Sequence, residues 1–283
     1  MIKINTITRG RFGNRILQYN SLMQIAKLSG TETSCAKWEG HDIFKDLVTQ
    51  KRSPNPHVIL DWRSVLACDM AALPNDNDFY IDDPAYCLHN VFYKVTKTDP
   101  REFLKIKDEY KVNLTPEKVH VGLHFRGTDI LGADGNHGRE IHSADYYADA
   151  ISLVERKFEG THYHVCTDDL QFDSFLKTVD FLKGRGLEFS LGSTSNFLQD
   201  FSTLSECDVL IASSSTFAIC AGLIGKEDKK IIHSNKWIQR NLDHIPWNDT
   251  KCEDTRKWQI SFDNFWVELY NGGNEFYKAW RIV

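Results

Sequence analysis

The stretch from residue 119 to residue 129, Val119-His120-Val121-Gly122-Leu123-His124-Phe125-Arg126-Gly127-Thr128-Asp129, decides the fold expected of this chain. Its apolar residues alternate with other residues, which is the period of a β-strand. His124 and Arg126 then lie on the opposite face at the carboxyl end, and Gly127 ends the strand. Ligands of open α/β sheets bind beyond the carboxyl ends of strands, where a guanidinium suits phosphate oxygens. Taken alone, these residues are equally compatible with a buried histidine and a structural salt bridge.

Strands and helices continue to alternate on the C-terminal side of this stretch. We expect strands at 161–167, 187–191, 208–212 and 229–233, and helices at 144–158, 170–181, 197–206 and 217–224. Repetition at this spacing predicts a doubly wound sheet of mostly parallel strands. The loop 131–140, rich in Gly, His and Asp, is a candidate lid.

The N-terminal part predicts a second α/β lobe. A strand within residues 2–8 precedes Gly10-Arg11-Phe12-Gly13-Asn14-Arg15, and a helix is expected over 16–28. This arrangement presents backbone N–H groups to a phosphate or sugar. It lacks the third glycine of a dinucleotide fingerprint, so by itself it indicates a tight turn. We expect an N-terminal lobe over 1–115 and a Rossmann-like lobe over 116–283, whose aromatic C-terminal segment packs back on the N-terminal lobe.

Composition excludes several classes of function. The formal net charge of −5 gives no general attraction for nucleic acid or an anionic membrane. The seven cysteines form no CxxC pair, so neither a zinc site nor a disulfide framework is indicated. The N-terminus lacks the apolar core of a signal peptide, and the run 209–225 is too short to span a membrane. We therefore expect a cytoplasmic protein with no nucleic-acid partner and no integral membrane segment.

Two patterns with metal-binding potential are better explained otherwise. Asp76-Asn77-Asp78 forms a carboxylate pair, but it precedes a strand, where Asn and Asp favour turn geometry. His162 and His164 share one strand face without a third ligand, which predicts cross-strand packing. We expect no metal site.

Polar groups follow three of the expected strands, and parallel strands would bring them to one crevice. His124 and Arg126 end one strand, Asp168-Asp169 follows another, and Ser213-Ser214-Ser215-Thr216 opens a helix after a third. Hydroxyl and N–H groups at a helix N-terminus form an anion site, which with Arg126 would clamp a diphosphate. No Gly-Lys-Ser/Thr follows, so a P-loop kinase or ATPase is disfavoured. Asp208, or a carboxylate nearby, is expected to accept from a guanine or ribose edge.

Four segments resemble, in order, the motifs of the GDP-fucose-dependent fucosyltransferases. Gly10-Arg11-Phe12-Gly13-Asn14-Arg15 resembles the G-x-x-G-N loop of α-1,2- and protein O-fucosyltransferases, and residues 124–129 resemble their H-x-R-(R)-x-D motif. Thr167-Asp168-Asp169 resembles the S/T-D-D of the α-1,2 group. Residues 206–217 are similar to the last donor-site motif, in which Ser/Thr and the following aromatic contact the nucleotide. The chain departs from these motifs at two places: Gly127 replaces a second arginine, and Ala218-Ile219-Cys220 replaces aromatic residues. The resemblance therefore leaves the donor sugar and the linkage open.

The resemblance implies a GT-B-like architecture of two Rossmann-like α/β lobes with mostly parallel sheets. It also implies inverting, metal-independent transfer of fucose from GDP-fucose to a glycan hydroxyl. The expected catalytic residues are Arg126, His124, Asn14 and Asp129, where Asn14 or Asp129 orients or deprotonates the acceptor. The expected donor-binding residues are Gly10, Arg11, Phe12, Gly13, Arg126, Asp168, Asp169, Asp208, Ser214, Ser215, Thr216 and Phe217.

The expected partners are a nucleotide-sugar donor and a glycan acceptor, with no cofactor beside the substrate. Two alternatives stay open. One is a transferase on the same scaffold that uses another nucleotide sugar, such as GDP-rhamnose or UDP-xylose. The other is a non-catalytic protein that binds a nucleotide or carbohydrate.

Overall fold

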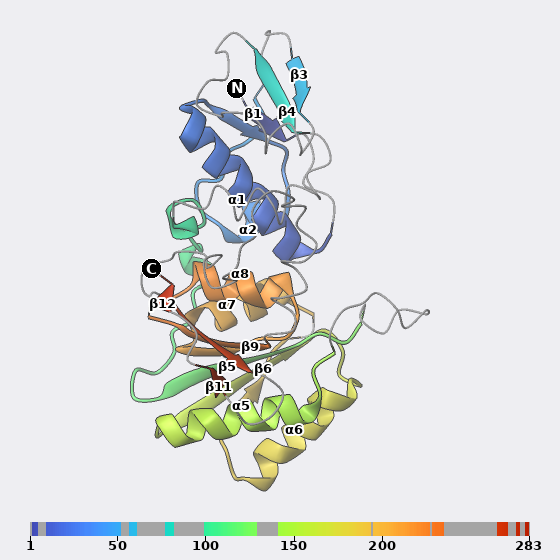
Figure 1. The fold of residues 1–283 in the computed structure, drawn as a ribbon, viewed down its shortest axis with the longest axis vertical. Coiled ribbons are helices and arrows are strands. Elements are labelled where there is room, and N and C mark those ends of the chain that lie inside the picture. Colours follow the sequence, from blue (N-terminus) through green and yellow to red (C-terminus); the bar gives the residue numbers. More distant parts are fainter. Residues whose placement is uncertain are drawn as a thin grey trace. The chain divides into compact units, whose positions relative to one another are not determined.

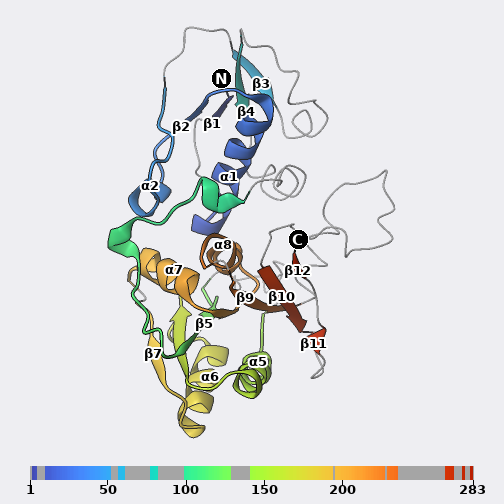
Figure 2. The ribbon, with the colours of Figure 1, turned by 90° about the vertical axis from the view of Figure 1, so that its left-hand side faces the viewer.

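The computed structural model describes residues 2–4, 10–51, 57–60, 77–81, 99–128, 141–193, 195–226, 228–234, 265–270, 276–277 and 281–282. These residues fall into two compact units, one ending at Lys107 and the other beginning at Asp108 (Figures 1 and 2). The expected lobe boundary at 115/116, and the packing of the C-terminal segment on the N-terminal lobe, stay predictions.

The first unit contains a parallel four-stranded sheet in the order β2-β1-β4-β3. Its elements are β1 (Ile2–Ile4), α1 (Phe12–Ser29), β2 (Thr33–Cys35), α2 (Gly40–Ile43), β3 (His57–Leu60), β4 (Asp78–Ile81) and a 3-10 turn at Pro100–Glu102. Helix α1 ends as expected, because Gly30 adopts the left-handed conformation with φ 63°. Asp78 is the buried first residue of β4, and Asp76 lies outside the described residues.

The second unit contains an eight-stranded sheet, ordered β11-β10-β9-β8-β5-β6-β7 with β12 beside β10. The strands are β5 (Val119–Phe125), β6 (Thr161–Thr167), β7 (Phe189–Leu191), β8 (Val209–Ile211), β9 (Lys230–Ser234), β10 (Phe265–Tyr270), β11 (Phe276–Tyr277) and β12 (Arg281–Ile282). Strands β5 to β10 are mutually parallel, and only β11 and β12 run antiparallel to β10. The expected α/β fold with mostly parallel sheets is confirmed. The strands from β10 onward were not expected from the sequence.

Helices cover both faces of this second sheet. Helices α5 (Ala144–Lys157) and α6 (Asp173–Gly184) lie on one face, and α7 (Phe197–Glu206) and α8 (Thr216–Ile224) lie on the other (Figure 1). A 3-10 turn at Asp108–Tyr110 precedes the sheet. Each helix follows the strand that the periodicity predicted, so the doubly wound arrangement expected from the sequence is present.

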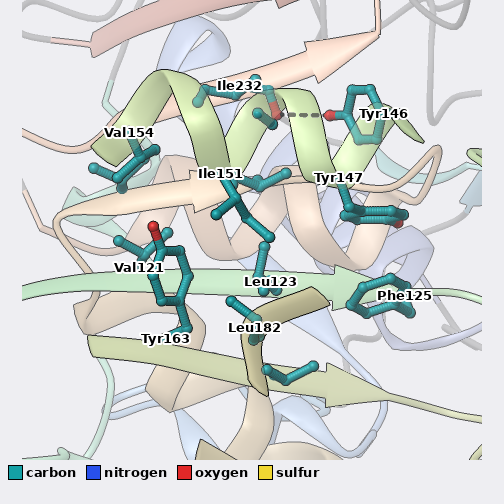
Figure 3. Packing of buried hydrophobic residues seen from close by; sticks show 14 of the residues in the cluster. Val121, Leu123, Phe125, Tyr146, Tyr147, Ile151, Val154, Tyr163, Leu182 and Ile232 are labelled. Atoms are coloured by element: carbon teal, nitrogen blue, oxygen red, sulfur yellow. Dashed lines mark hydrogen bonds between the residues drawn. The ribbon is translucent and has the colours of Figure 1, made fainter. Parts of the chain in front are cut away.

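The two faces of β5 pack against different helices. Val121, Leu123 and Phe125 are fully buried in the apolar cluster beneath α5 and α6, where Phe125 stacks on Tyr147 (Figure 3). On the other face Gly122 leaves room for α7, because a Cβ there would lie 2.7 Å from Leu204 Cδ2. The alternation of the sequence therefore becomes a core face and a face closed by α7.

Three histidines pack across β5 and β6 beside this glycine. His120 Nδ1 lies 2.9 Å from His164 Nε2, and Ser190 Oγ lies 3.1 Å from both His164 Nδ1 and His162 Nε2. His162 also contacts Glu188, which pairs with Lys118. The cross-strand packing expected of His162 and His164 is thus observed. The pKa of His164 is lowered to about 4, mainly by burial and in smaller part by the neighbouring His162 and His120.

We expect Gly122→Ala to destabilise the protein by about 1–3 kcal/mol, because the added methyl group overpacks the contact between β5 and α7. Gly184→Ala is the matched control, since nothing lies within 4 Å of a Cβ placed there. Urea unfolding at pH 7.5 measures both variants. Equal stabilities for the two variants would show that α7 does not pack tightly on β5.

We expect His164→Asn to reduce the loss of stability in acid. The unfolded chain protonates this histidine below about pH 6.5, whereas the folded protein does so only near pH 4. Its contribution is therefore complete above pH 6.5 and decreases as the pH falls toward 4, by about 2 kcal/mol at pH 5. Urea unfolding at pH 7.5 and pH 5.0 tests this. A wild-type and a variant that lose the same stability would contradict it.

Candidate functional site

The carboxyl end of β5 carries a buried, neutral histidine. His124 is 7% exposed, and its Nδ1 lies 2.7 Å from Ser213 Oγ at the carboxyl end of β8. The ring of Phe217 stacks on it at 5.2 Å. Burial lowers the pKa of His124 to about 4, with Asp168 opposing and Arg126 reinforcing the shift. At neutral pH His124 therefore serves as an uncharged hydrogen-bonding partner of Ser213.

The turn after β5 is organised by Asp168, which follows β6. Asp168 Oδ1 accepts from the backbone N–H of Gly127 at 2.6 Å, and Oδ2 accepts from Thr128 Oγ1 at 2.7 Å. These bonds turn the chain away from the direction of β5 directly after Arg126. Arg126 itself is half-buried. The register pairs Phe125 with Thr167, so Asp168 is positioned beside this turn by the parallel pairing of β5 and β6.

Gly127 fits this turn because it has no side chain. A Cβ at this position would lie 2.8 Å from Asp169 Cβ and 3.1 Å from Phe172 Cβ. Asp169 is itself held in place, since its Oδ1 accepts from Gln171 N at 2.9 Å. A second arginine would have no space here, which gives a physical reason for the departure from the two-arginine motif.

The loop between β8 and α8 holds three buried serines. Ser213 Oγ contacts His124, Ser214 Oγ lies 3.1 Å from His142 Nε2, and Ser215 Oγ caps α8 by accepting from Phe217 N at 3.2 Å. The serines are 2–3% exposed, whereas Thr216 and Phe217 are half-buried. Thr216 and Phe217, the first two residues of α8, are therefore more accessible than the serines before them. An α-helix leaves its first N–H groups without partners inside the helix, so the start of α8 favours an anion.

Two expected site residues, Asp208 and Asp129, are not found beside the serine loop in the described structure. Asp208 precedes β8, where its Oδ2 accepts from His120 N at 2.9 Å and its Oδ1 pairs with Lys226. A strand advances by about 3.3 Å per residue, so Asp208 lies at the opposite end of β8 from Ser213. Asp129 lies outside the described residues.

The glycine-bearing turn belongs to the first unit. Gly10 has φ 77°, and a Cβ there would lie 2.8 Å from Asn14 Cβ. Both the backbone conformation and the lack of space therefore exclude a side chain at this position. Arg15 donates through Nε to Gly10 O at 3.1 Å and pairs with Glu39. Arg11 is exposed, whereas Phe12 and Gly13 are buried. Roles of Gly10, Arg11, Phe12, Gly13 and Asn14 in donor binding or catalysis stay predictions.

Two residues of the second unit were missed by sequence reasoning. His142 holds Ser214, and Asp200 is a buried carboxyl on α7, against which a Cβ of Gly192 would lie at 2.5 Å. Burial raises the pKa of Asp200 to about 6, although its bonds to Ser193 N and to Cys166 oppose this. Asp200 and Cys166 lie near the carboxyl ends of β6 and β7, since Cys166 pairs in register with His124. No sequence pattern distinguishes either residue.

Within the part of the chain that the structure describes, no group of three or more His, Cys, Asp or Glu side chains could hold a metal ion. None of the helices in the described ranges is long and apolar enough to cross a bilayer.

No protein-family model and no curated protein sequence matches this chain, but solved structures do. POFUT1 in complex with GDP superposes with a TM-score of 0.56 and 11% identity, over 81% of this chain and 94% of that chain. POFUT1 in complex with GDP-fucose gives a TM-score of 0.53 and 12% identity, over the same shares of 81% and 94%. The fucosyltransferase NodZ from Bradyrhizobium gives a lower TM-score of 0.45, at 12% identity over 79% and 93%. The similarity to POFUT1 shows that the chain has its fold, in agreement with the GT-B-like architecture that the motif resemblance implied.

Proposed function

We propose that this protein is a glycosyltransferase that moves fucose from GDP-fucose to a hydroxyl of a glycan, with inversion and without a metal ion. One observation carries the proposal. At the carboxyl ends of β5 and β8, His124 contacts the serine loop, and Arg126 lies two residues after His124, in the fold of POFUT1, which has been solved with GDP-fucose. The order of the four motif segments along the chain supports the same assignment.

The chemistry needs a site that stabilises a leaving diphosphate. Transfer breaks the bond between the sugar carbon and the phosphate oxygen, so negative charge develops on GDP while the sugar becomes oxocarbenium-like. The guanidinium of Arg126 supplies a cation with a planar set of donors, and the N-terminus of α8 supplies a favourable dipole. The start of α8 is fixed before the reaction by the Ser215 cap, and donors that are preorganised in this way lower a barrier.

His124 supports this site as a neutral side chain. Its pKa of about 4 makes it a hydrogen-bonding group at neutral pH, and it contacts both Ser213 and Phe217. In this proposal, His124 fixes the serine loop and the Phe217 ring beside the leaving nucleotide. The acceptor hydroxyl must lose its proton as the new bond forms, and a carboxylate such as Asp129 can accept that proton, whereas the amide of Asn14 can only orient the hydroxyl.

We expect GDP and GDP-fucose to raise the melting temperature and UDP, ADP and CDP to leave it unchanged. A ligand at 100 times its Kd adds about 2.7 kcal/mol of stability, which corresponds to several degrees. Addition of EDTA should not alter the shift, because Arg126 and α8 replace a metal. A thermal-shift panel measures this. A shift with UDP alone would exclude the fucose assignment, and a shift abolished by EDTA would exclude metal independence.

We expect Arg126→Ala to reduce transfer from GDP-fucose by about 10²-fold or more, because removing one preorganised donor costs that much. Arg126→Lys should fall between this variant and wild type, since lysine keeps the charge without the planar set of donors. Arg156→Ala is the matched control, because Arg156 is an exposed residue of α5. Initial rates of GDP release, with and without acceptor, measure the effect.

An Arg126→Ala variant that retains near-normal turnover would remove the arginine from the mechanism. A wild-type protein that binds GDP but never hydrolyses or transfers the sugar would instead favour a non-catalytic nucleotide-binding protein.

A further inference from the structure

His142 is a buried histidine that the proposed chemistry does not use. It is 5% exposed and lies two residues before α5. Its ring stacks on Tyr146 at 4.4 Å and meets the edge of Tyr147 at 6.4 Å. Its carbonyl oxygen accepts from Ser174 Oγ at 2.8 Å, which ties it to α6. Contacts other than the one with the serine loop therefore already fix the position of His142.

The His142 ring makes a polar contact with the serine loop. His142 Nε2 lies 3.1 Å from Ser214 Oγ, and both residues are buried. Tyr146 holds the residue just before the loop, since its hydroxyl donates to Ala212 O at 2.9 Å. His142 and Tyr146 are four residues apart, so they fix two successive parts of the connection from β8 to α8.

The serine loop is held by two histidines in succession. Ser213 bonds to His124 on β5, and the next residue, Ser214, bonds to His142, two residues before α5. The backbone between them is tight, because Ser215 N donates to Ser213 O at 2.7 Å. A loop anchored through two consecutive side chains has little freedom to reorient its N–H groups.

We propose that His142 is a positioning residue for the nucleotide diphosphate, acting through Ser214. By holding Ser214 it fixes the approach of the chain to the N-terminus of α8, where the anion is expected. Preorganised donors bind an anion without the cost of ordering them first. This inference rests on the proposed function, because it assumes that a GDP diphosphate occupies this end of the sheet.

The test is a double-mutant cycle read out by the Kd of GDP. His142→Phe keeps an aromatic ring against Tyr146 and removes the hydrogen bond, and Ser214→Ala removes the other partner. We expect each variant to raise the Kd of GDP about 5- to 10-fold. The double variant should be no weaker than either single variant, because the two side chains act through one bond. His142→Gln should restore the Kd to within about twofold, since its side-chain N–H can reach Ser214.

The matched control is His162→Phe with Ser190→Ala. This pair also has a His Nε2 and a Ser Oγ 3.1 Å apart, but it belongs to the histidine cluster of β6 and β7 and contacts none of the proposed site residues in the described structure. We expect these variants to change stability and leave the Kd of GDP unchanged. A parallel change in Kd would mean that any loss of a His–Ser bond acts through general loosening, which would overturn the inference.

The outcomes separate the two levels of the proposal. A wild-type protein that binds no GDP overturns the proposed function and with it this inference. A wild-type protein that binds GDP, together with unchanged Kd values for Ser214→Ala and His142→Phe, overturns only the role of His142. Should His142→Phe fail to fold, Ser214→Ala and His142→Gln decide the question, and strictly additive effects in their double variant would also count against the inference.

Discussion

The parallel pairing of β5 with β6 on one side and β8 on the other is the constraint on which the candidate site depends. The register joins Phe125 to Thr167 and Leu123 to Ile211. Each strand therefore ends at the same edge of the sheet, and the residue after each end is delivered to one place. Asp168 then bonds to the turn after β5, and Ser213 bonds to His124. A shift of one residue in either pairing would move these side chains to the opposite face.

The polar groups at this edge are mostly engaged with one another. Ser213, Ser214 and Ser215 each use their hydroxyl inside the protein, and Asp168 uses both carboxylate oxygens in the turn. The bonds of the three buried serines favour a fixed geometry, because a buried polar group that loses its partner incurs a desolvation penalty. These contacts hold the serine loop, the Phe217 ring and the start of α8 in place. Contact of Ser214 and Ser215 with the donor, which the sequence suggests, stays a prediction.

The sequence predicted the second unit well and particular residues less well. Regular alternation in β5 and β6 defines strands locally, and the helices that follow have apolar spacing of their own. Asp208 was grouped with the site because it is near Ser213 in the sequence. A short extended strand nevertheless separates the two residues toward opposite edges of the sheet. His142 and Asp200 escaped notice because burial and partners come from distant elements, which no local pattern encodes.

Strand periodicity, the placement of Gly127 and the order of the motif segments were determined by the sequence itself, because each depends on neighbouring residues along the chain. Strand order, register and the partners of buried polar groups were decided only by the tertiary structure. The serine loop is the clearest case: its letters indicate an anion site at a helix N-terminus, as the structure allows. Only the packing of β5 and α5 around it supplies the two histidines that hold Ser213 and Ser214. The two residues of each His–Ser contact are 72 positions apart for His142 and Ser214 and 89 positions apart for His124 and Ser213. Such contacts form only when the whole fold brings distant segments together, so no local sequence pattern reveals them.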